Sequence, residues 1–477
     1  MPELVSPPFL TLLGLVLLHA IGIGHIVHVL IHGRTAQGTI AWIVCMAVLP
    51  WLAIPFYWIA GRRRFTGYVR ARRSEDEDVR RTLEDLHRRL REYELEPDDA
   101  FGRAARTLGG LPFTKGNDIE LLIDGDETFT AIFRAIASAE NYLLVNFFIV
   151  KNDLVGRKFQ QALIERARKG VRVFFLFDEI GSHKLPNAYL AEMEDAGIEC
   201  HSFGTNRFWW SRLQINFRNH RKIVVVDGRE AFIGGLNVGD EYLGRDKKFG
   251  AWRDTHLQLR GPTVQAIQLV FLEDWNWAAD ERITGLDWDG DPQPHDEITA
   301  ILPTGPADPA DSWQLIVAEA CNSAKQRLWI TSPYFVPDAG VLTALQTAAI
   351  RGVDVRILLP EKADHRMVWL AAFTFYEETL PYGIRLFRYH EGFLHQKVML
   401  VDDRYGFVGT GNLDNRSFRL NFEITAVTTD TGFIGELTEM LEKDFDRSRE
   451  VEMEDFTKSH VLFRLACRAA RLAAPVL

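Results

Sequence analysis

One short pattern occurs twice in the chain, with the same internal spacing in both copies. In each copy a histidine is followed by a lysine, four apolar residues, an aspartate and, beyond a glycine-containing segment, an asparagine. The matched residues are His220, Lys222, Asp227 and Asn237 in the first copy and His395, Lys397, Asp402 and Asn412 in the second. Such a repeat indicates two similar structural units that each supply the same side chains. It restricts the fold more strongly than any other feature of the sequence.

The spacing of the pattern predicts where these side chains lie. Side chains alternate along an extended strand, so a histidine and a lysine two residues apart lie on the same side. The apolar residues after each lysine predict a buried strand, and each aspartate falls where a hairpin turn is expected. A glycine-rich bend would then bring the asparagine beside the histidine and the lysine. If the two units pack face to face, one site contains two imidazoles, two ammonium groups and two amides.

This set of side chains is suited to phosphoryl transfer. One neutral histidine can attack phosphorus and form a phosphohistidine, while the other, protonated, gives its proton to the leaving oxygen. The lysines and asparagines can bind the non-bridging oxygens, so the predicted site needs no metal ion or other cofactor. The alternative, a buried histidine without a catalytic role, would have to occur twice at one spacing.

Each histidine also needs a group that orients its ring. Asp254 and Glu423, each downstream of one copy of the pattern, are the candidates, with ordinary ion pairing as the alternative. Two roles stay open for Asp227 and Asp402. One is a structural role in fixing the hairpin turn, and the other is a role in catalysis.

The body of the chain is predicted to consist of two copies of one α/β unit. From about Leu111 onward, apolar strand-like runs alternate with amphipathic helical stretches. Asn141–Val150 and Arg327–Val336 match as the first strand of each half, and the predicted lobes are residues 109–290 and 291–455. Residues 63–108 are predicted to be a charged helical linker, with an apolar seam that includes Val79, Leu83, Leu86, Leu90 and Tyr93.

The first 62 residues are predicted to form a transmembrane hairpin. Two runs, Phe9–Ile31 and Ile40–Ala60, contain no Asp, Glu, Lys or Arg, and each is long enough to cross a hydrocarbon core of about 30 Å. Six arginines lie between Arg62 and Arg73 but only Arg34 lies in the connector, so the positive-inside rule places both termini in the cytoplasm. A cleaved signal peptide fits badly because no basic residue precedes the first run. Hydrogen bonds to the partner helix are the simplest explanation for three histidines in the first run, His19, His25 and His28.

Composition and charge exclude several classes of protein. The chain has 477 residues, with 55 Lys and Arg against 65 Asp and Glu, and its net charge of −10 disfavours a protein that wraps nucleic acid. Its 47% hydrophobic residues are enough to build packed cores. Neither a disulfide framework nor a thiolate metal site is expected from four scattered cysteines, Cys45, Cys200, Cys321 and Cys467.

Two further segments are suited to contact with lipid. The run Phe208–Arg212 places two tryptophans beside an arginine, which fits a membrane interface or, equally, a contact between the lobes. In the tail, residues 456–477, Arg464, Arg468 and Arg471 lie among apolar residues and predict a basic amphipathic helix on anionic lipid. A terminal helix docked on the body is the alternative for the tail.

These residues carry a resemblance to a known family. The duplicated H-x-K-x4-D-x6-G-x-[GL]-N pattern resembles the two active-site motifs of the phospholipase D superfamily. The N-terminal hairpin, together with Ser332–Asp338 and Gly411–Ser417, more narrowly resembles bacterial cardiolipin synthases. The resemblance covers nearly the whole chain, and its paired motifs are highly specific for the superfamily.

The resemblance implies a fold and a reaction. The implied fold is two phospholipase D-like α/β lobes related by a pseudo-two-fold axis, preceded by the two-helix transmembrane hairpin, with the active site between the lobes. The two implied active-site motifs are His220, Lys222 and Asp227, and His395, Lys397 and Asp402. The implied reaction condenses two phosphatidylglycerol molecules into cardiolipin and releases glycerol. We expect His220 to be the nucleophile and His395 the general acid and base, and the reverse assignment stays open.

Three functions remain open from the sequence. The first is the cardiolipin synthase, whose partners are phosphatidylglycerol and anionic membrane lipid, with a homo-oligomer left open. It is expected in the bacterial inner membrane, multi-pass, with a cytoplasmic catalytic body. The second is a hydrolase of the same superfamily, because no motif reports whether an alcohol or water accepts the phosphatidyl group. The third is a membrane scaffold with an inactive site. Such a protein is expected to lack the His, Lys or Asn of one copy of the pattern, whereas both copies here are intact.

Overall fold

The computed structural model describes residues 7–33, 36–61, 88–204 and 216–476. The chain divides into two units, of which the smaller contains the N-terminal apolar helices and the larger contains both lobes. Three predicted features lie outside the described residues: the arginines from Arg62 to Arg73, most of the apolar seam of the linker, and the run Phe208–Arg212.

The N-terminal unit contains three helices, α1 (Pro7–His32), α2 (Ala36–Val48) and α3 (Pro50–Ala60). Only α1 is long and apolar enough to cross a membrane, among the described helices, with a mean hydropathy of 2.1 over Leu10–His32. The predicted second span is therefore not confirmed as one continuous helix. Pro50 begins a new helix after Leu49, and each of the two pieces is shorter than a hydrocarbon core of about 30 Å.

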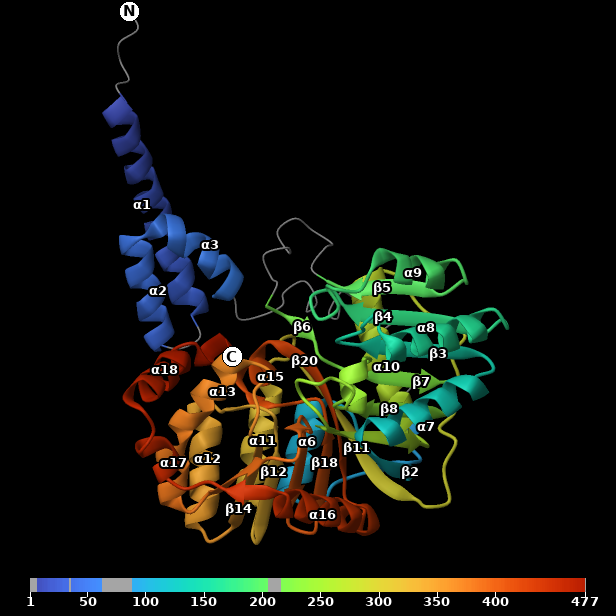
Figure 1. The fold of residues 1–477 in the computed structure, drawn as a ribbon. Helices are drawn as coiled ribbons and strands as arrows, with labels where there is room; N and C mark the ends of the chain where they lie inside the picture. Colours follow the sequence, from blue (N-terminus) through green and yellow to red (C-terminus); the bar gives the residue numbers. More distant parts are fainter. Residues whose placement is uncertain (1–6, 34–35, 62–87, 205–215, 477) are drawn as a thin grey trace, which may run out of the picture. The chain divides into compact units, whose positions relative to one another are not determined.

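The helices α2 and α3 turn back along the second half of α1 (Figure 1). Helix α2 runs antiparallel to α1, and a side chain at Gly22 would lie 2.7 Å from the carbonyl oxygen of Met46. Helix α3 then runs parallel to α1. Its Trp51 ring lies 6.4 Å from the ring of His19, and the Trp58 indole donates a hydrogen bond to His25 Nε2 at 3.0 Å.

Hydrogen bonds between the helices account for two of the histidines in α1. His25 accepts from the indole of Trp58, and His28 Nδ1 lies 2.9 Å from the hydroxyl of Tyr57. Both partners lie on α3. Polar side chains that pair across an interface in this way fix how the helices pack, as expected for an apolar unit with few other directional contacts.

The first lobe is a three-layer α/β/α unit. The order of its sheet is β5-β4-β3-β7-β8-β10-β2, in which β3, β4 and β5 are parallel and the other pairs are antiparallel. The strands are β2 (Phe113–Ile123), β3 (Tyr142–Phe147), β4 (Arg172–Asp178), β5 (Glu199–Phe203), β7 (Ile223–Val226), β8 (Glu230–Gly234) and β10 (Thr255–Arg260). One face is covered by α7 (Asp124–Ser138), α8 (Leu154–Ala167) and α9 (Asn187–Glu194), and the other by α10 (Thr263–Ala279).

The second lobe repeats this arrangement, with the order β21-β15-β14-β12-β17-β18-β20-β11. The strands are β11 (Glu297–Thr304), β12 (Arg327–Thr331), β14 (Asp354–Pro360), β15 (Arg385–Tyr389), β17 (Val398–Val401), β18 (Tyr405–Gly409), β20 (Asn421–Thr428) and β21 (Ser448–Glu450). The main helices are α11 (Ser312–Ser323), α12 (Ala339–Ile350), α13 (Arg366–Ala372) and α16 (Thr431–Asp446). Each lobe has its own apolar core. The predicted pair of similar α/β units is therefore confirmed.

The long strand β2 joins the two lobes. Its second half pairs with β10 of the first lobe, and its first half pairs with β11 of the second lobe and with β1 (Glu94–Leu95). Helix α6 (Ala100–Gly109), most of which the sequence analysis assigns to the linker, packs into the core of the second lobe. The ring of its Phe101 lies 4.6 Å from the ring of Tyr405.

Short elements complete the larger unit. Three short strand pairings are important for the site or lie beside it: β6 (Arg218–Asn219) against the start of β20, β9 (Trp252–Arg253) against β16 (Phe393–Leu394), and β13 (Phe335–Val336) against β19 (Leu413–Asp414). The remaining helices are α14 (Tyr376–Thr379), α15 (Asn415–Arg419), α17 (Glu454–Thr457) and α18 (Val461–Arg471), with 3-10 turns at Asp240–Leu243, Phe373–Phe375, Leu380–Tyr382 and Ala474–Val476.

Aspartate side chains begin several of these helices. Asp99, Asp153, Asp338 and Asp430 each accept a hydrogen bond from the backbone amide three residues further on. Such N-caps satisfy amide groups that have no partner within the helix, and each contributes about 1 kcal/mol. The boundaries of α6, α8, α12 and α16 are therefore set by local sequence.

Candidate active site

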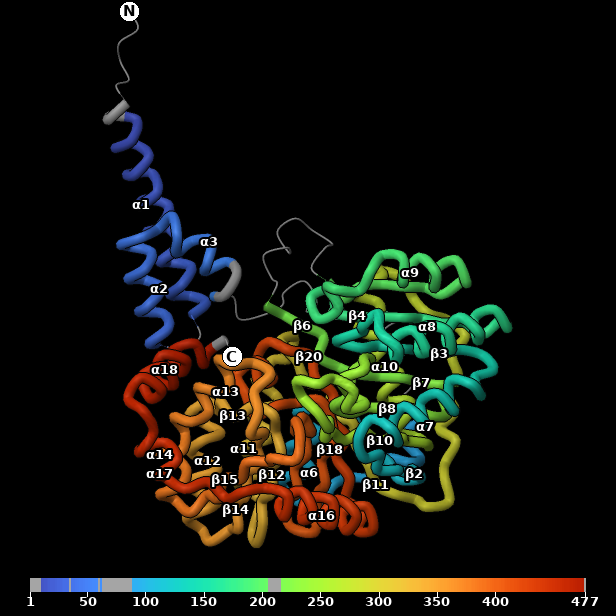
Figure 2. Tube along the Cα trace, viewed as in Figure 1, coloured from blue at the N-terminus to red at the C-terminus, as the bar shows by residue number. Residues whose placement is uncertain are grey.

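Two short parallel strand pairs bring the halves of the site together. In one pair, β6 lies beside the start of β20 (Figure 2), and the His220 amide donates to the Phe422 carbonyl at 2.9 Å. In the other, β16 lies beside β9, and the His395 amide donates to the Arg253 carbonyl at 2.8 Å. The residue after each pair is a histidine in one lobe and an acid in the other. The register of the backbone therefore places each histidine against an acid.

The imidazole–carboxylate pairs cross between the lobes. His220 Nδ1 of the first lobe lies 2.8 Å from Oε2 of Glu423 in the second lobe. His395 Nδ1 of the second lobe lies 2.9 Å from Oδ2 of Asp254 in the first lobe. An ionised carboxylate only accepts hydrogen bonds, so Nδ1 carries the proton and Nε2 of a neutral ring keeps its lone pair. The structure thus places Asp254 and Glu423, the two residues that the sequence proposed as orienting groups, against the histidines, and it adds the pairing.

Each acid is itself held by further donors. Glu423 accepts from the hydroxyl of Ser417 at 2.7 Å and from the amide of Asn421 at 3.2 Å. Asp254 accepts from the indole of Trp252 at 3.3 Å and from the backbone amide of Thr255 at 2.9 Å. Fixed carboxylates hold the rings in one orientation, which is what directed attack by Nε2 requires.

The surroundings favour ionised acids and neutral imidazoles. Burial raises the pKa of Glu423, but His220 beside it brings the pKa below its ordinary value. Burial likewise opposes ionisation of Asp254, and Lys397 and His395 hold the pKa of that carboxyl below its ordinary value. Burial lowers the pKa of His220 to about 4, although Glu423 opposes this shift. Burial and then Lys397 lower the pKa of His395.

Both lysines of the pattern are buried in the site and donate to the carbonyl of their own histidine, but their other contacts differ. Lys222 Nζ donates to the backbone carbonyl of His220 at 2.6 Å and lies 5.5 Å from the centre of the Phe148 ring. Lys397 Nζ donates to the His395 carbonyl and also lies 2.9 Å from Nδ1 and 3.2 Å from Nε2 of the same imidazole. Burial lowers the pKa of Lys222 to about 7 and that of Lys397 to about 8.

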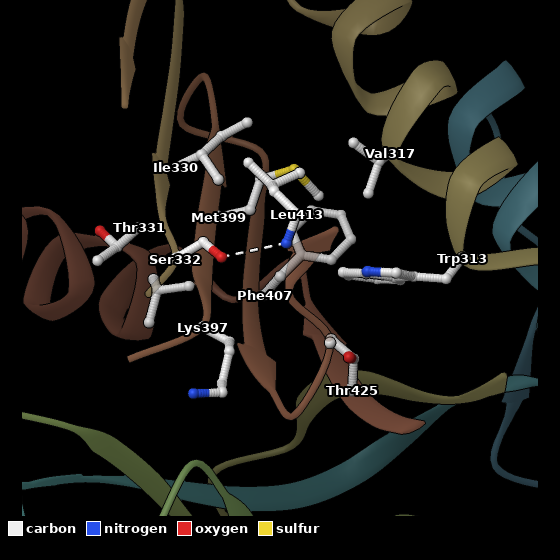
Figure 3. Close-up of a pocket in the computed structure, with 12 residues that line it drawn as sticks. Trp313, Val317, Ile330, Thr331, Ser332, Lys397, Met399, Phe407, Leu413 and Thr425 are labelled. Atoms are coloured by element: carbon white, nitrogen blue, oxygen red, sulfur yellow. Dashed lines mark hydrogen bonds between the residues drawn. The ribbon is translucent and has the colours of Figure 1, made fainter. Parts of the chain in front are cut away.

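An apolar wall contributes to the burial of Lys397. Figure 3 shows this lysine at the edge of a cavity of about 20 Å³, with its ammonium group directed away from the apolar side chains. Trp313, Phe407 and Leu413 are part of the wall, and the cavity has room for about one water molecule. A wall of low polarity strengthens the interaction of the ammonium group with any anion in the site.

The two asparagines of the pattern differ in their contacts. Asn237 Oδ1 accepts from the backbone amide of Ile149 at 3.0 Å, and its Nδ2 donates to the Tyr242 hydroxyl at 3.0 Å. Asn412 Oδ1 is buried without a hydrogen-bond partner among the described residues. Both polar atoms of the Asn237 side chain are thus hydrogen-bonded within the protein, whereas the side-chain oxygen of Asn412 has no partner among the described residues.

The two aspartates of the pattern lie at the far ends of their strands from the histidines. Asp227 accepts hydrogen bonds from the backbone amides of Glu140, Asn141 and Tyr142. Asp402 accepts from the amides of residues 325–327 in the same way. Both have a φ of 52°, the left-handed conformation of a turn. These contacts favour the structural role over the catalytic one, because the carboxylates face a loop and not the imidazoles.

Aromatic rings surround the histidines, and the sequence analysis did not assign them to the site. The Phe148 ring lies 5.1 Å from His220, and the rings of Trp252, Phe393 and Tyr334 lie 5.2, 5.9 and 6.4 Å from His395. Two signals could have found them: Phe148 lies near the end of the predicted strand Asn141–Val150, and Phe393 lies two residues before its histidine. Among the described residues, no three His, Cys, Asp or Glu side chains gather where they could hold a metal ion.

Comparison with known proteins places these features in context. A family model described as "Cardiolipin synthase, PLD-like domain" matches residues 132–275 and 317–448, once in each lobe. Cardiolipin synthase A of Pseudomonas putida KT2440 is 46% identical over 472 residues, which cover 98% of this chain and 97% of that protein. Cardiolipin synthase A of Pseudomonas entomophila L48 is 45% identical, with 97% of both chains covered.

A solved structure with a similar fold is the phosphatidylserine synthase of Haemophilus influenzae Rd KW20. It covers 80% of this chain and 100% of its own, with a TM-score of 0.60 and 15% sequence identity. At this identity the likeness shows the fold alone.

Proposed function

The chain belongs to the cardiolipin synthase family with phospholipase D-like domains, and we propose that His220 and His395 carry out its reaction between the two lobes. It is a phosphatidyltransferase that joins two phosphatidylglycerol molecules into cardiolipin and releases glycerol. The observation that carries the proposal is the crossed pairing of each imidazole with an acid of the opposite lobe. It makes the two histidines parts of one site.

In the first step, Nε2 of His220 attacks the phosphorus of the donor lipid. The bond from phosphorus to the headgroup glycerol oxygen breaks, and protonated His395 gives its proton to that oxygen, so glycerol leaves. Lys222 and Lys397 bind the non-bridging oxygens and counter their charge. A phosphate anion between the lysines also raises the pKa of His395, which favours its acid form when substrate is bound.

In the second step, a headgroup hydroxyl of the acceptor lipid takes the place of the glycerol that has left. His395 now accepts the hydroxyl proton, the oxygen attacks phosphorus, and the bond between phosphorus and His220 breaks. Cardiolipin forms, and both histidines return to their initial states. No metal ion takes part in either step, so a chelator should leave the rate unchanged.

The choice of His220 as nucleophile rests on the lysine contacts. Lys397 Nζ lies 2.9 Å from Nδ1 and 3.2 Å from Nε2 of His395, so its ammonium group lies against this ring and disfavours it as the attacking nucleophile. Nε2 of His220 has no hydrogen-bond partner among the described residues. A free lone pair favours attack, and a ring beside a cation is better suited to pass a proton on.

Hydrolysis is the alternative function, because water can replace the acceptor hydroxyl in the second step. Purified protein in liposomes that contain phosphatidylglycerol alone separates the two. Cardiolipin and glycerol should appear together, whereas phosphatidic acid as the main lipid product would support the hydrolase and contradict the proposal.

We propose that the protein lies in the bacterial inner membrane with its catalytic body in the cytoplasm, where the arginines that follow α3 are expected. If α1 crosses the bilayer and α2 and α3 return within it, the N-terminus lies on the opposite side from the body. This topology collects Arg34 and the later arginines on one side. The two-span hairpin predicted from the sequence would instead place the N-terminus in the cytoplasm.

Labelling of intact cells distinguishes the two topologies. A Glu3→Cys variant in a Cys45→Ser background should react with a membrane-impermeant maleimide before lysis if the N-terminus is outside. A Lys458→Cys control on the body should react only after lysis. Labelling of Glu3→Cys only after lysis would support the two-span hairpin.

The C-terminal helix α18 is proposed to rest on anionic lipid. Its side chains Val461, Leu462, Leu465 and the following Leu472 are exposed. Two of its arginines pair with the body, Arg468 with Glu377 and Arg471 with Glu378. The helix is thus docked and still presents an apolar edge, which is the arrangement of an interfacial helix. Deletion of residues 461–477 should weaken binding to phosphatidylglycerol vesicles, and mass measurement in detergent would test for a homo-oligomer.

A further inference from the structure

A groove of about 530 Å³ opens between the lobes on the side of His395. The first lobe lines it with Lys248 and Phe249. The second lobe lines it with residues between Glu361 and Trp369, in the segment that follows β14. Lys362 joins its two sides, because Nζ donates to the Phe249 carbonyl at 3.3 Å. The groove therefore belongs to both lobes, as the active site does.

Aromatic rings lie between this groove and His395. On one side, the Phe249 ring lies 5.5 Å from the Trp252 ring and 5.1 Å from the Phe393 ring, both of which face His395. On the other side, Asp364 accepts a hydrogen bond from the Tyr334 hydroxyl, and the Tyr334 ring also faces His395. The charge of Asp364 acts on His395 across these rings and raises its pKa against the stronger effect of burial.

The lining of the groove contains three cationic and two acidic side chains. Lys248, Lys362 and Arg366 line it, and none of them forms an ion pair with a carboxylate of the described residues. The two acids in the lining have other partners: Glu361 lies 3.5 Å from Arg449, and Asp364 binds the Tyr334 hydroxyl. A concave surface with unpaired cations and flanking aromatic rings is suited to an anionic group.

The second step of the proposed reaction requires such a place. His395 must accept the proton of the attacking hydroxyl, so the headgroup of the acceptor lipid has to lie beside this histidine. That headgroup carries its own phosphate, separated from the hydroxyl by a short glycerol chain. The acceptor phosphate cannot share Lys222 and Lys397 with the donor phosphoryl group without strong repulsion between the two anions.

We propose that Lys248, Lys362 and Arg366 bind the phosphate of the acceptor phosphatidylglycerol. This inference rests on the proposed function, and it assigns the acceptor to the His395 side of the site. The cations select an acceptor that carries a phosphate over water and over neutral alcohols. They therefore determine whether the phosphatidyl group ends in cardiolipin.

Two reactions of the same enzyme test the proposal. Labelled glycerol can replace the acceptor lipid and return the phosphatidyl group to phosphatidylglycerol, so exchange of glycerol reports the donor steps with an acceptor that has no phosphate. A triple variant, Lys248→Gln, Lys362→Gln and Arg366→Gln, is assayed for both reactions in phosphatidylglycerol vesicles. Cardiolipin synthesis should fall about tenfold or more relative to glycerol exchange.

The control is an Arg168→Gln, Lys169→Gln variant of the first lobe. It removes two exposed positive charges at positions that are distant in the sequence from the residues of the groove. It should leave the ratio of the two reactions unchanged. Equal losses in both reactions of the triple variant would overturn the proposal, because vesicle binding, folding and donor binding are common to both. No loss in either reaction would also overturn it. Failure of the wild-type protein to catalyse exchange or synthesis would instead contradict the proposed function.

Discussion

The two halves of the site have the same sequence pattern but different local contacts. In the first half-site, formed by His220, Lys222, Asn237 and Glu423, the lysine contacts only a backbone carbonyl and an aromatic ring, and the asparagine is fully hydrogen-bonded. In the second, formed by His395, Lys397, Asn412 and Asp254, the lysine lies against the imidazole and one asparagine oxygen has no partner among the described residues. The repeat therefore duplicates the parts of the site without duplicating their roles.

The difference arises in the segment that follows the first strand of each lobe. In the first lobe, the amide of Ile149 binds Asn237 Oδ1. In the second lobe, the hydroxyl of Ser332 accepts hydrogen bonds from the amides of Tyr334 and Leu413. Asn412 Oδ1 has no hydrogen-bond partner among the described residues. A side chain that the fold does not use is available to a substrate.

The largest expected effect comes from removal of either histidine. His220→Ala and His395→Ala should each lower cardiolipin synthesis by about a thousandfold or more, because one bond-forming group or one proton carrier is lost. The two differ with a donor whose leaving group needs no proton, such as a nitrophenyl phosphodiester. His395→Ala should then still accumulate a phosphoenzyme, detected by mass spectrometry, and His220→Ala should not. A phosphoenzyme in His220→Ala would reverse the assignment of roles.

A smaller effect is expected from the acids, and it should cross between the lobes. Glu423→Gln should slow phosphoenzyme formation with the nitrophenyl donor by about a hundredfold, since it removes the charge that orients His220. Asp254→Asn should spare that step and slow cardiolipin synthesis, since it acts through His395. The ratio of the two rates is the measurement. If each acid affected the histidine of its own lobe, the crossed pairing would be wrong.

The aspartates of the pattern should affect stability and not the chemical step. Asp227→Asn or Asp402→Asn weakens several hydrogen bonds to backbone amides and should lower the free energy of unfolding by about 1–3 kcal/mol. Thermal unfolding in detergent measures this loss. Activity per folded molecule should stay within about twofold of the wild type, and a loss as large as that of a histidine variant would restore the catalytic role.

The smallest expected effect is a pH dependence that separates the lysines. Besides the fall in kcat/KM as His395 loses its proton, for which the pKa is lowered, kcat/KM should fall as the pH rises through the pKa of Lys222, about 7, and then that of Lys397, about 8, because a charged lysine binds phosphate. Lys222→Gln should remove the lower inflection and keep the upper one, and Lys397→Gln should do the reverse. Identical profiles for the two variants would mean that the lysines titrate as one group.

The sequence predicts the repeated elements well because they depend on local patterns. The strands Ile223–Val226 and Val398–Val401, the turns at Asp227 and Asp402 and the division into two lobes all follow from residue spacing. The pairing of His220 with Glu423 does not, because it depends on the register of β6 against β20, two segments far apart in the chain.

Two other features needed tertiary information. Pro50 divides the second apolar run, and a proline in such a run is compatible with either a kinked span or a turn back, so only packing against Gly22 decides. The aromatic rings around His395 come from three separate segments, and no spacing rule links Trp252 with Tyr334.

The crossed carboxylates also couple assembly to catalysis. A nick in the connection between β10 and β11 would release two fragments, each of which holds an imidazole whose counter-ion has left with the other. Both rings would lose orientation together, so neither fragment could cleave a phospholipid on its own. On the proposed mechanism, a half-finished or proteolysed chain would be inactive, and catalysis would begin only when the lobes have docked.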